Sequence, residues 1–193
     1  MSADARAAVM AAMEARVTNP HTRRHMLATE AIMRGVARRL ATDPEVWGLA
    51  GLAHDLDVDE TMDDFSRHGA VAAAALRELG VPEAVAHAVA AHNPETGATM
   101  DNPLDVALFA SDQLSGLITA AALVRPDKDL AGVQLKSLRK RYRETAFARG
   151  VDREAIARCA ELGFELDEFM SIGLAAMQAA RDELGLNGEG SGA

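Results

Sequence analysis

The 193-residue chain has little of several residue types on which common architectures depend. It contains one cysteine, one tryptophan and one tyrosine, and aromatic residues make up 4% of it. A single cysteine excludes an internal disulfide, and the helical pattern around Cys159 predicts a small core residue rather than a reactive thiol. Uninterrupted apolar runs of about 20 residues are missing, and charges interrupt the N-terminal segment where a signal peptide needs an apolar stretch. We therefore expect a cytoplasmic protein with no membrane partner.

Positive charge is also scarce. The chain has 20 Lys and Arg residues against 29 Asp and Glu residues, which gives a formal net charge of −9. All three lysines lie in residues 125–143, a locally basic segment, whereas residues 55–64 hold six acidic residues and no basic one. A chain of this overall charge repels polyanions. We therefore expect no long nucleic acid as a partner.

Helix-forming residues dominate what is present. Ala, Leu, Met, Glu and Arg are abundant, and the alternating Val, Ile, Thr and Tyr runs that indicate strands are absent. Proline, glycine, asparagine and aspartate divide the chain into segments. The sequence therefore predicts an all-α protein, with helices near residues 3–17, 20–41, 44–54, 66–79, 82–92, 103–123, 133–148, 152–162 and 165–185.

These helices are expected to form one domain, because neither an internal repeat nor a linker divides the chain. We expect an N-terminal helix in residues 1–19, a central core in 20–124, and C-terminal helices in 125–186 that complete the same domain. Residues 187–193 are polar and glycine-rich, and we predict a disordered tail there. A homo-oligomer is compatible with this organisation.

Helical phase indicates which histidines face the core. His25 shares a stripe with Ile32 and other apolar residues, and His68 and His92 also line up with the apolar stripes of their predicted helices. His87 shares its face with an acidic residue and is predicted to face solvent.

Two acidic positions are also predicted to be buried. Asp112 lies in a segment that is apolar on nearly every face, where an unpaired carboxylate would cost several kcal/mol and therefore needs a cation, a donor or a metal. His54 and Asp55 end the segment PEVWGLAGLAHD, where adjacent side chains can converge because the backbone leaves helical geometry. Trp47 in the same segment is predicted to be a core residue.

Taken singly, an inward histidine is most often a hydrogen-bonded core residue. Taken together, three inward histidines, a His-Asp pair and a buried aspartate are six polar groups in a domain with few others. They form a nitrogen and oxygen ligand set suited to Fe, Mn, Co or Zn, with no thiolate in reach. The sequence therefore predicts that these six side chains meet at a metal site between the central helices.

The order of these residues along the chain resembles the H…HD…H…H…D pattern of the HD-domain superfamily, which consists of all-helical, metal-dependent phosphohydrolases. The phrases HMLATEAIMRGVA, WGLAGLAHDLD, RHGAVAAAALRELG and ALFASDQLSGLI are most similar to its small HDIG-type proteins. The resemblance implies a helical bundle that binds a divalent transition metal, two ions per chain, with Fe or Mn favoured and Co, Zn, Ni or Mg as alternatives. It assigns one ion to His25, His54, Asp55 and Asp112, and a second, bridged by Asp55, to His68 and His92.

The chain departs from the family pattern at two places. The family motif HDIGK reads here as His54-Asp55-Leu56-Asp57-Val58, so an aspartate replaces the glycine and a valine replaces the lysine that contacts phosphate. Some dinuclear members have a second histidine after the position of His92, where this chain has Asn93.

The resemblance implies hydrolysis of a phosphomonoester or phosphodiester in a small phosphorylated metabolite or nucleotide, through a metal-activated hydroxide. Catalytic roles then fall to His54, Asp55 and a cation that replaces the missing lysine. The candidates for this cation lie in the basic segment and are Arg125, Lys128, Lys136 and Lys140, with Lys128 as the first choice. The alternative is that this segment is only a solvated helix face.

Two other functions stay open at this point. A minority of HD-domain proteins with a similar ligand set are oxygenases with a mixed-valent di-iron centre, and the missing lysine favours this alternative. A regulatory module that binds a nucleotide without turning it over is the third. His21 is either exposed or in contact with substrate, and the acidic residues after Asp55 form either a mobile, solvated lid or a cation site.

Overall fold

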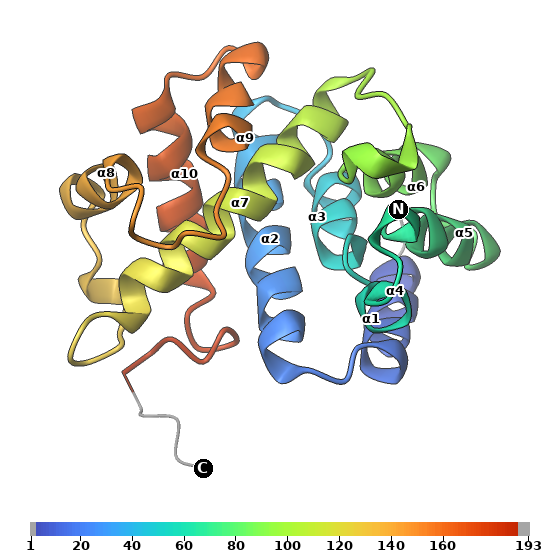
Figure 1. The fold of residues 1–193 in the computed structure, drawn as a ribbon, viewed down its shortest axis with the longest axis horizontal. Helices are drawn as coiled ribbons and strands as arrows, with labels where there is room; N and C mark the ends of the chain where they lie inside the picture. The colour runs from blue at the N-terminus through green and yellow to red at the C-terminus, as the bar shows by residue number, and fades with distance from the viewer. Residues whose placement is uncertain (1–2, 189–193) are drawn as a thin grey trace.

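The computed structural model describes residues 3–188, which form ten α-helices, four short 3-10 helices and no strand (Figure 1). This confirms the all-α prediction. The α-helices are α1 (Ala3–Arg16), α2 (Pro20–Arg39), α3 (Pro44–Ala53), α4 (Val58–Thr61), α5 (Ala70–Glu78), α6 (Glu83–Ala91), α7 (Pro103–Leu123), α8 (Leu135–Arg143), α9 (Arg153–Ala157) and α10 (Leu166–Ala179). The 3-10 helices are η1 (Phe65–Arg67), η2 (Pro94–Thr96), η3 (Leu130–Gly132) and η4 (Arg158–Leu162).

The long central helices begin at strong local signals. Asn19, Asp43 and Asn102 each precede a proline, and their side-chain oxygens accept backbone N–H groups of the first turns of α2, α3 and α7. The departures from prediction lie elsewhere. The helix predicted from residue 66 begins at Ala70, because Gly69 has a left-handed φ of 85°. The helices predicted to end at residues 148 and 185 end at residues 143 and 179, and α4 was not predicted.

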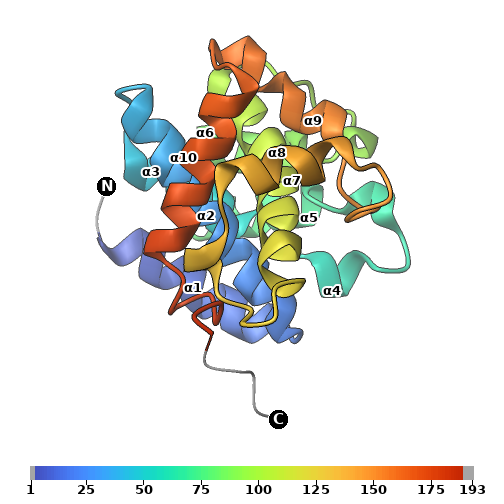
Figure 2. The ribbon, with the colours of Figure 1, turned by 90° about the vertical axis from the view of Figure 1, so that its left-hand side faces the viewer.

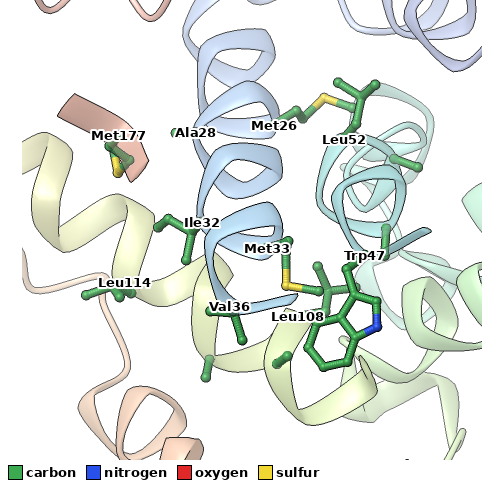
Figure 3. Packing of buried hydrophobic residues seen from close by; sticks show 14 of the residues in the cluster. Met26, Ala28, Ile32, Met33, Val36, Trp47, Leu52, Leu108, Leu114 and Met177 are labelled. Carbon is green, nitrogen blue, oxygen red and sulfur yellow. The ribbon is translucent and has the colours of Figure 1, made fainter. Parts of the chain in front are cut away.

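The helices α2, α3 and α7 form the centre of the fold. α2 packs most extensively against α3, and Gly51 permits this approach, because a Cβ atom there would lie 2.7 Å from the backbone nitrogen of Glu30. Figure 1 shows α7 running obliquely across α2. Figure 3 shows the apolar core between the three helices, to which each contributes buried side chains: Met26, Ile32, Met33, Val36, Trp47, Leu52, Leu108 and Leu114. Trp47 is therefore a core residue, as predicted.

The C-terminal helices complete this core from the other side of α7. α10 packs along α2 and α8, and Figure 2 shows it on the face toward the viewer. One cluster of buried apolar residues extends from Val9 to Leu186. The backbone N–H of Leu130 donates to the carbonyl of Leu186 over 2.8 Å, and Asn187 forms an isolated bridge with Asp129. Asn187 is thus ordered against the fold, whereas residues 189–193 of the predicted tail lie outside the described residues.

Two apolar features of the sequence find their explanation in this core. In the described range, α7 is the one helix long and apolar enough to cross a membrane, but 61% of its apolar stretch is buried inside the fold. It is therefore packed as a core helix. Cys159 is 1% exposed, and burial raises the pKa of its thiol to about 11, so it is the inert core residue that the sequence predicts.

Candidate metal centre

The first group of candidate ligands joins the three central helices. His25 lies near the start of α2, His54 follows the last residue of α3, and Asp112 lies midway along α7. The Nε2 atoms of His25 and His54 are 3.1 Å apart, and Nε2 of His25 is 2.9 Å from Oδ1 of Asp112. The close approach of α2 to α3 at Gly51, one turn before His54, brings the two rings together.

The second group is built around Asp55. Its Oδ1 atom lies 3.3 Å from Nε2 of His68 and 3.9 Å from Nε2 of His92, and these two nitrogens are 3.1 Å apart. The same oxygen is 3.4 Å from Nε2 of His54. Asp55 therefore belongs to two groups of donor atoms, each compact enough to hold one ion: His25, His54 and Asp55, and Asp55, His68 and His92.

The outer nitrogen of each histidine already has a partner. Nδ1 of His54 lies 2.8 Å from the carbonyl oxygen of Gly51, and Nδ1 of His92 lies 2.5 Å from that of Val89. A carbonyl oxygen only accepts hydrogen bonds, so both Nδ1 atoms carry the proton. In a neutral ring this leaves a lone pair on Nε2, directed toward the candidate centre.

His25 and His68 follow the same pattern with other partners. Nδ1 of His25 lies 2.9 Å from Oγ of Ser115, whose hydroxyl donates to the carbonyl of Asp112. Nδ1 of His68 lies 2.9 Å from a carboxylate oxygen of Asp57. When all four rings are neutral, four imidazole lone pairs and two carboxylates converge, and the set then presents acceptors to acceptors. Such a donor set fits a divalent cation, because a cation replaces the repulsion between the acceptors by attraction.

The electrostatics keep both carboxylates ionised. Burial raises the pKa of Asp55, but the neighbouring charge of His54 and a hydrogen bond with His68 outweigh burial and hold this pKa far below its usual range. Burial also raises the pKa of Asp112, and the hydrogen bond with His25 outweighs it, so this pKa is lowered too. The carboxylates are thus in the form that a metal requires at neutral pH.

The pKa values of the two histidines of the second group shift in opposite directions. Burial, together with the charge of His54, lowers the pKa of His92 to about 4. Burial acts in the same direction on His68, but hydrogen bonds with Asp55 and Asp57 outweigh it and raise the pKa of His68 to about 9. For His25, burial is likewise outweighed by the hydrogen bond with Asp112, and its pKa is raised. A metal at the second group therefore competes with a proton on His68.

Asp57 was predicted only as one of the acidic residues after Asp55, in a solvated lid or a cation site, and its contact with His68 was not foreseen. It is fully buried, and while one oxygen faces His68, the other accepts the backbone N–H groups of Gly69 and Ala72 over 2.8 Å each. His68 is buried, as predicted, with 4% of its surface exposed. The predicted reason is wrong, because His68 precedes α5 and does not lie on an apolar stripe of that helix. The available signal was Asp57 itself, an aspartate in place of the motif glycine.

Asn93 supports the same histidine from the other side. Its Nδ2 donates to the carbonyl oxygens of Phe65 and His68 over 2.8 and 3.0 Å, and its side-chain oxygen accepts the N–H of Glu95. The Phe65 ring stacks on the His68 ring with centroids 4.7 Å apart. Asn93 is thus used to hold the segment before α5, and in this structure it is not a member of either ligand group.

The acidic segment is neither fully solvated nor lid-like. Asp57 is buried, one carboxylate oxygen of Asp59 accepts both the N–H and the hydroxyl of Thr18, and Glu60 pairs with Arg16. Glu60, Asp63 and Asp64 are exposed, and of these Asp63 and Asp64 lie beyond the tied residues. The predicted mobile lid is therefore corrected to a segment that is tied to the N-terminal end of the fold.

A cavity of about 560 Å³ opens beside His25 and is lined by α2, α7, Lys128 and the segment 184–188. Lys128 and His25 thus line the same cavity, and a phosphate contact of Lys128 stays a prediction. The rest of the basic segment does not line it. Arg125 pairs with Asp127, and Lys136 and Lys140 line a separate depression along α8.

The two other histidines differ from each other. His21 is exposed and also lines the cavity beside His25, and contact with a substrate stays a prediction. His87 is corrected from solvent-facing to half-buried. Its Nδ1 atom lies 3.2 Å from a carboxylate oxygen of the fully buried Asp105.

Residues 22–117 match the model of the HD domain, and the chain belongs to this family. HD domains bind divalent metals, and most members of the family are metal-dependent hydrolases. The matched range contains both ligand groups in full. Searches of curated proteins and of solved structures gave no match.

Proposed function

We propose that this protein is a metal-dependent phosphohydrolase that acts on a phosphomonoester or phosphodiester of a small metabolite or nucleotide. The observation that carries the proposal is the shared position of Asp55 between two compact ligand groups in an HD domain. A carboxylate shared in this way matches a pair of cations a few ångström apart, the arrangement used to cleave phosphate esters.

His25, His54, Asp55 and Asp112 would hold one ion, and Asp55, His68 and His92 would hold the other, with Fe or Mn favoured. The ions supply a water nucleophile active at neutral pH and positive charge for the phosphate oxygens. The chain itself orients the ligands through Gly51, Val89, Ser115 and Asp57, so that every Nε2 lone pair faces inward.

Lys128 takes the place of the motif lysine, which is Val58 in this chain. Lys128 lines the same cavity as His25, and its ammonium group would neutralise a phosphate oxygen as charge develops. His54 and Asp55 would serve the reaction by holding and orienting the ions. No other protein nucleophile is needed for this chemistry.

The second candidate is an oxygenase with a mixed-valent di-iron centre. The specific observation in its favour is Val58, an apolar and half-buried residue at the position of the phosphate-contacting lysine. The nitrogen and oxygen ligand set suits iron as well as manganese.

One experiment separates these candidates. Protein loaded anaerobically with Mn²⁺ is assayed for phosphate release from a panel of nucleotides and sugar phosphates, and the iron-loaded form is tested on an oxygen electrode. We expect phosphate release without oxygen uptake. We expect Lys128→Ala to weaken it by about tenfold or more at unchanged metal content, whereas Lys136→Ala, which removes an equal charge from α8, leaves it unchanged.

Other outcomes contradict the proposal in distinct ways. Substrate-dependent oxygen uptake with no phosphoester cleavage would establish the oxygenase. Tight nucleotide binding with neither activity would identify a regulatory module.

A further inference from the structure

The cavity beside His25 has two chemically different kinds of wall. Positive groups come from α2 and from the loop after α7, namely Arg24 and Lys128, and the imidazole of His21 also lines the cavity. Aliphatic groups come from α2, α7 and the C-terminal segment: Ala28, Ala120, Leu123, Leu184 and Leu186. Its volume of about 560 Å³ lies in the range of small-molecule sites. A cavity with these walls suits a molecule that has an anionic end and an apolar body.

Two cations of this cavity, Arg24 and Lys128, have no acidic partner among the residues that the structure describes. Within residues 3–188, neither Arg24 nor Lys128 has a carboxylate oxygen within 4.0 Å, although the chain carries 29 acidic residues and most of its arginines are paired. Lys128 also has a left-handed φ of 50°, which is costly for a residue with a Cβ atom. Unpaired cations, one of them on a strained backbone, are the arrangement expected where an anion binds.

The remaining lining lacks the groups that usually recognise a nucleobase. Among the described lining residues there is no Phe, Tyr or Trp side chain to stack on a base, and no Asp, Glu, Asn or Gln side chain to bond its edge. Thr119 supplies the one side-chain hydroxyl. The walls therefore favour an aliphatic body over a nucleoside.

The aliphatic wall is firmly held. Leu184 and Leu186 are 2% and 7% exposed, and the hydrogen bond from the Leu130 N–H to the Leu186 carbonyl fixes the segment. The Arg24 guanidinium lies against Gly185, whose φ is 64°. The cavity is thus a preformed site, and a ligand does not have to order it first.

We propose that this cavity binds the organic part of the substrate, and that the substrate is a phosphate monoester of an aliphatic alcohol. The phosphate lies at the end of the cavity that reaches His25, and the alkyl part lies against Leu123, Leu184 and Leu186. Arg24 and Lys128 add positive charge along the walls of the same cavity. This inference rests on the proposed function for the position of the phosphate. It adds the class of alcohol, which no family resemblance supplies.

The test measures binding with alkylphosphonates, whose phosphorus–carbon bond replaces the hydrolysable ester. Calorimetry on Mn²⁺-loaded protein under anaerobic conditions compares methyl-, butyl-, hexyl- and octylphosphonate with adenosine monophosphate. We expect Kd to fall with each added methylene, up to about fourfold for a fully buried one. Octylphosphonate should bind more tightly than the nucleotide.

Matched variants assign the effect to the cavity. Leu123 and Val124 are neighbouring, similarly exposed residues at the end of α7, but only Leu123 lines the cavity. Leu123→Asn should weaken octylphosphonate by about fivefold or more and leave methylphosphonate unchanged, whereas Val124→Asn changes neither. A second variant, Thr119→Glu, adds a carboxylate to the lining and should weaken every phosphonate in the series.

The outcomes separate this inference from the proposed function. A Kd that is independent of chain length, no phosphonate binding, or tighter binding of the nucleotide overturns the aliphatic site. Phosphate release together with a Kd that is independent of chain length would support the proposed hydrolase and contradict the aliphatic site. A Kd that depends on chain length, with no phosphate release from octyl phosphate, would support the aliphatic site and contradict the hydrolase.

Discussion

The two halves of the candidate metal centre are held in place by different means. In the first half, His25 and Asp112 lie within the long helices α2 and α7, and the core between these helices fixes them. In the second half, His68 and His92 lie at the ends of the short elements η1 and α6. Buried side chains such as Asp57 and Asn93 support that half. Helix packing positions the first half, and a polar network positions the second.

This difference predicts how the halves respond to substitution. Damage to the network should affect the second half alone, because α2, α3 and α7 do not depend on it. Damage to Asp55, which both halves share, should affect both.

Asp55→Ala should therefore have the largest effect. We expect metal content to fall toward zero at both positions and turnover to fall by about a hundredfold or more. A chelator should lower the melting temperature of the wild-type protein by several degrees but leave that of the variant unchanged. Asp63→Ala, an exposed acid of the same segment, is the control, and elemental analysis with melting curves is the measurement. Wild-type metal content in Asp55→Ala would contradict the shared site.

His68→Ala should remove one half only. The first group keeps all its ligands, so we expect roughly one metal per chain where the wild type has two, with a loss of turnover of similar size to that of Asp55→Ala. Metal content is measured by mass spectrometry after exchange into metal-free buffer. A variant that keeps two metals and full activity would show that the second group is not a metal site.

Asp57→Asn tests the support of that half without touching a ligand. An amide cannot accept at both of its ends, so either His68 or the N–H groups of Gly69 and Ala72 lose their acceptor. We expect the affinity of the second metal to fall by about 10- to 100-fold while the first is retained. Asp59→Asn, which alters an acid bonded to Thr18 instead, should leave both affinities unchanged in a metal titration. Equal weakening of both metals would mean that the halves are not separate.

Asn93→Ala should have the smallest effect. It leaves the carbonyl oxygens of Phe65 and His68 without their donor, at a cost of about 1 to 3 kcal/mol in the free energy of unfolding. Urea unfolding of the metal-loaded protein measures this cost, and metal content should be unchanged. Loss of a metal in this variant would make Asn93 part of the centre rather than its scaffold.

The same contrast explains what the sequence could predict. The positions of His25 and Asp112 followed from helical phase, because long helices carry a regular period. The position of His68 did not, because Gly69 breaks the helix and phase has no meaning outside it. Asp57 was one acid in an acidic run, and apart from its place at the motif glycine nothing local distinguishes a buried carboxylate there from a solvated one.

The cavity wall shows a second limit of local patterns. The segment 184–188 lines the same cavity as Lys128, and a hydrogen bond between Leu130 and Leu186 holds it there. Because these residues are far apart in the chain, no local pattern predicts this contact. Basic residues close in sequence were grouped as one candidate surface. In the fold, Lys128 and Lys136 line different depressions, because the turn at residues 125–133 separates them.

The left-handed backbone of Lys128 sets stability against function at one residue. Glycine adopts this conformation without steric cost, so Lys128→Gly would relieve the strain while removing the ammonium group. Selection for thermal stability alone would therefore favour loss of the lysine, and selection for anion binding would keep it. If a screen for stabilised variants selects small residues at position 128, the reason would be relief of backbone strain. Such a result would not mean that Lys128 is dispensable for anion binding.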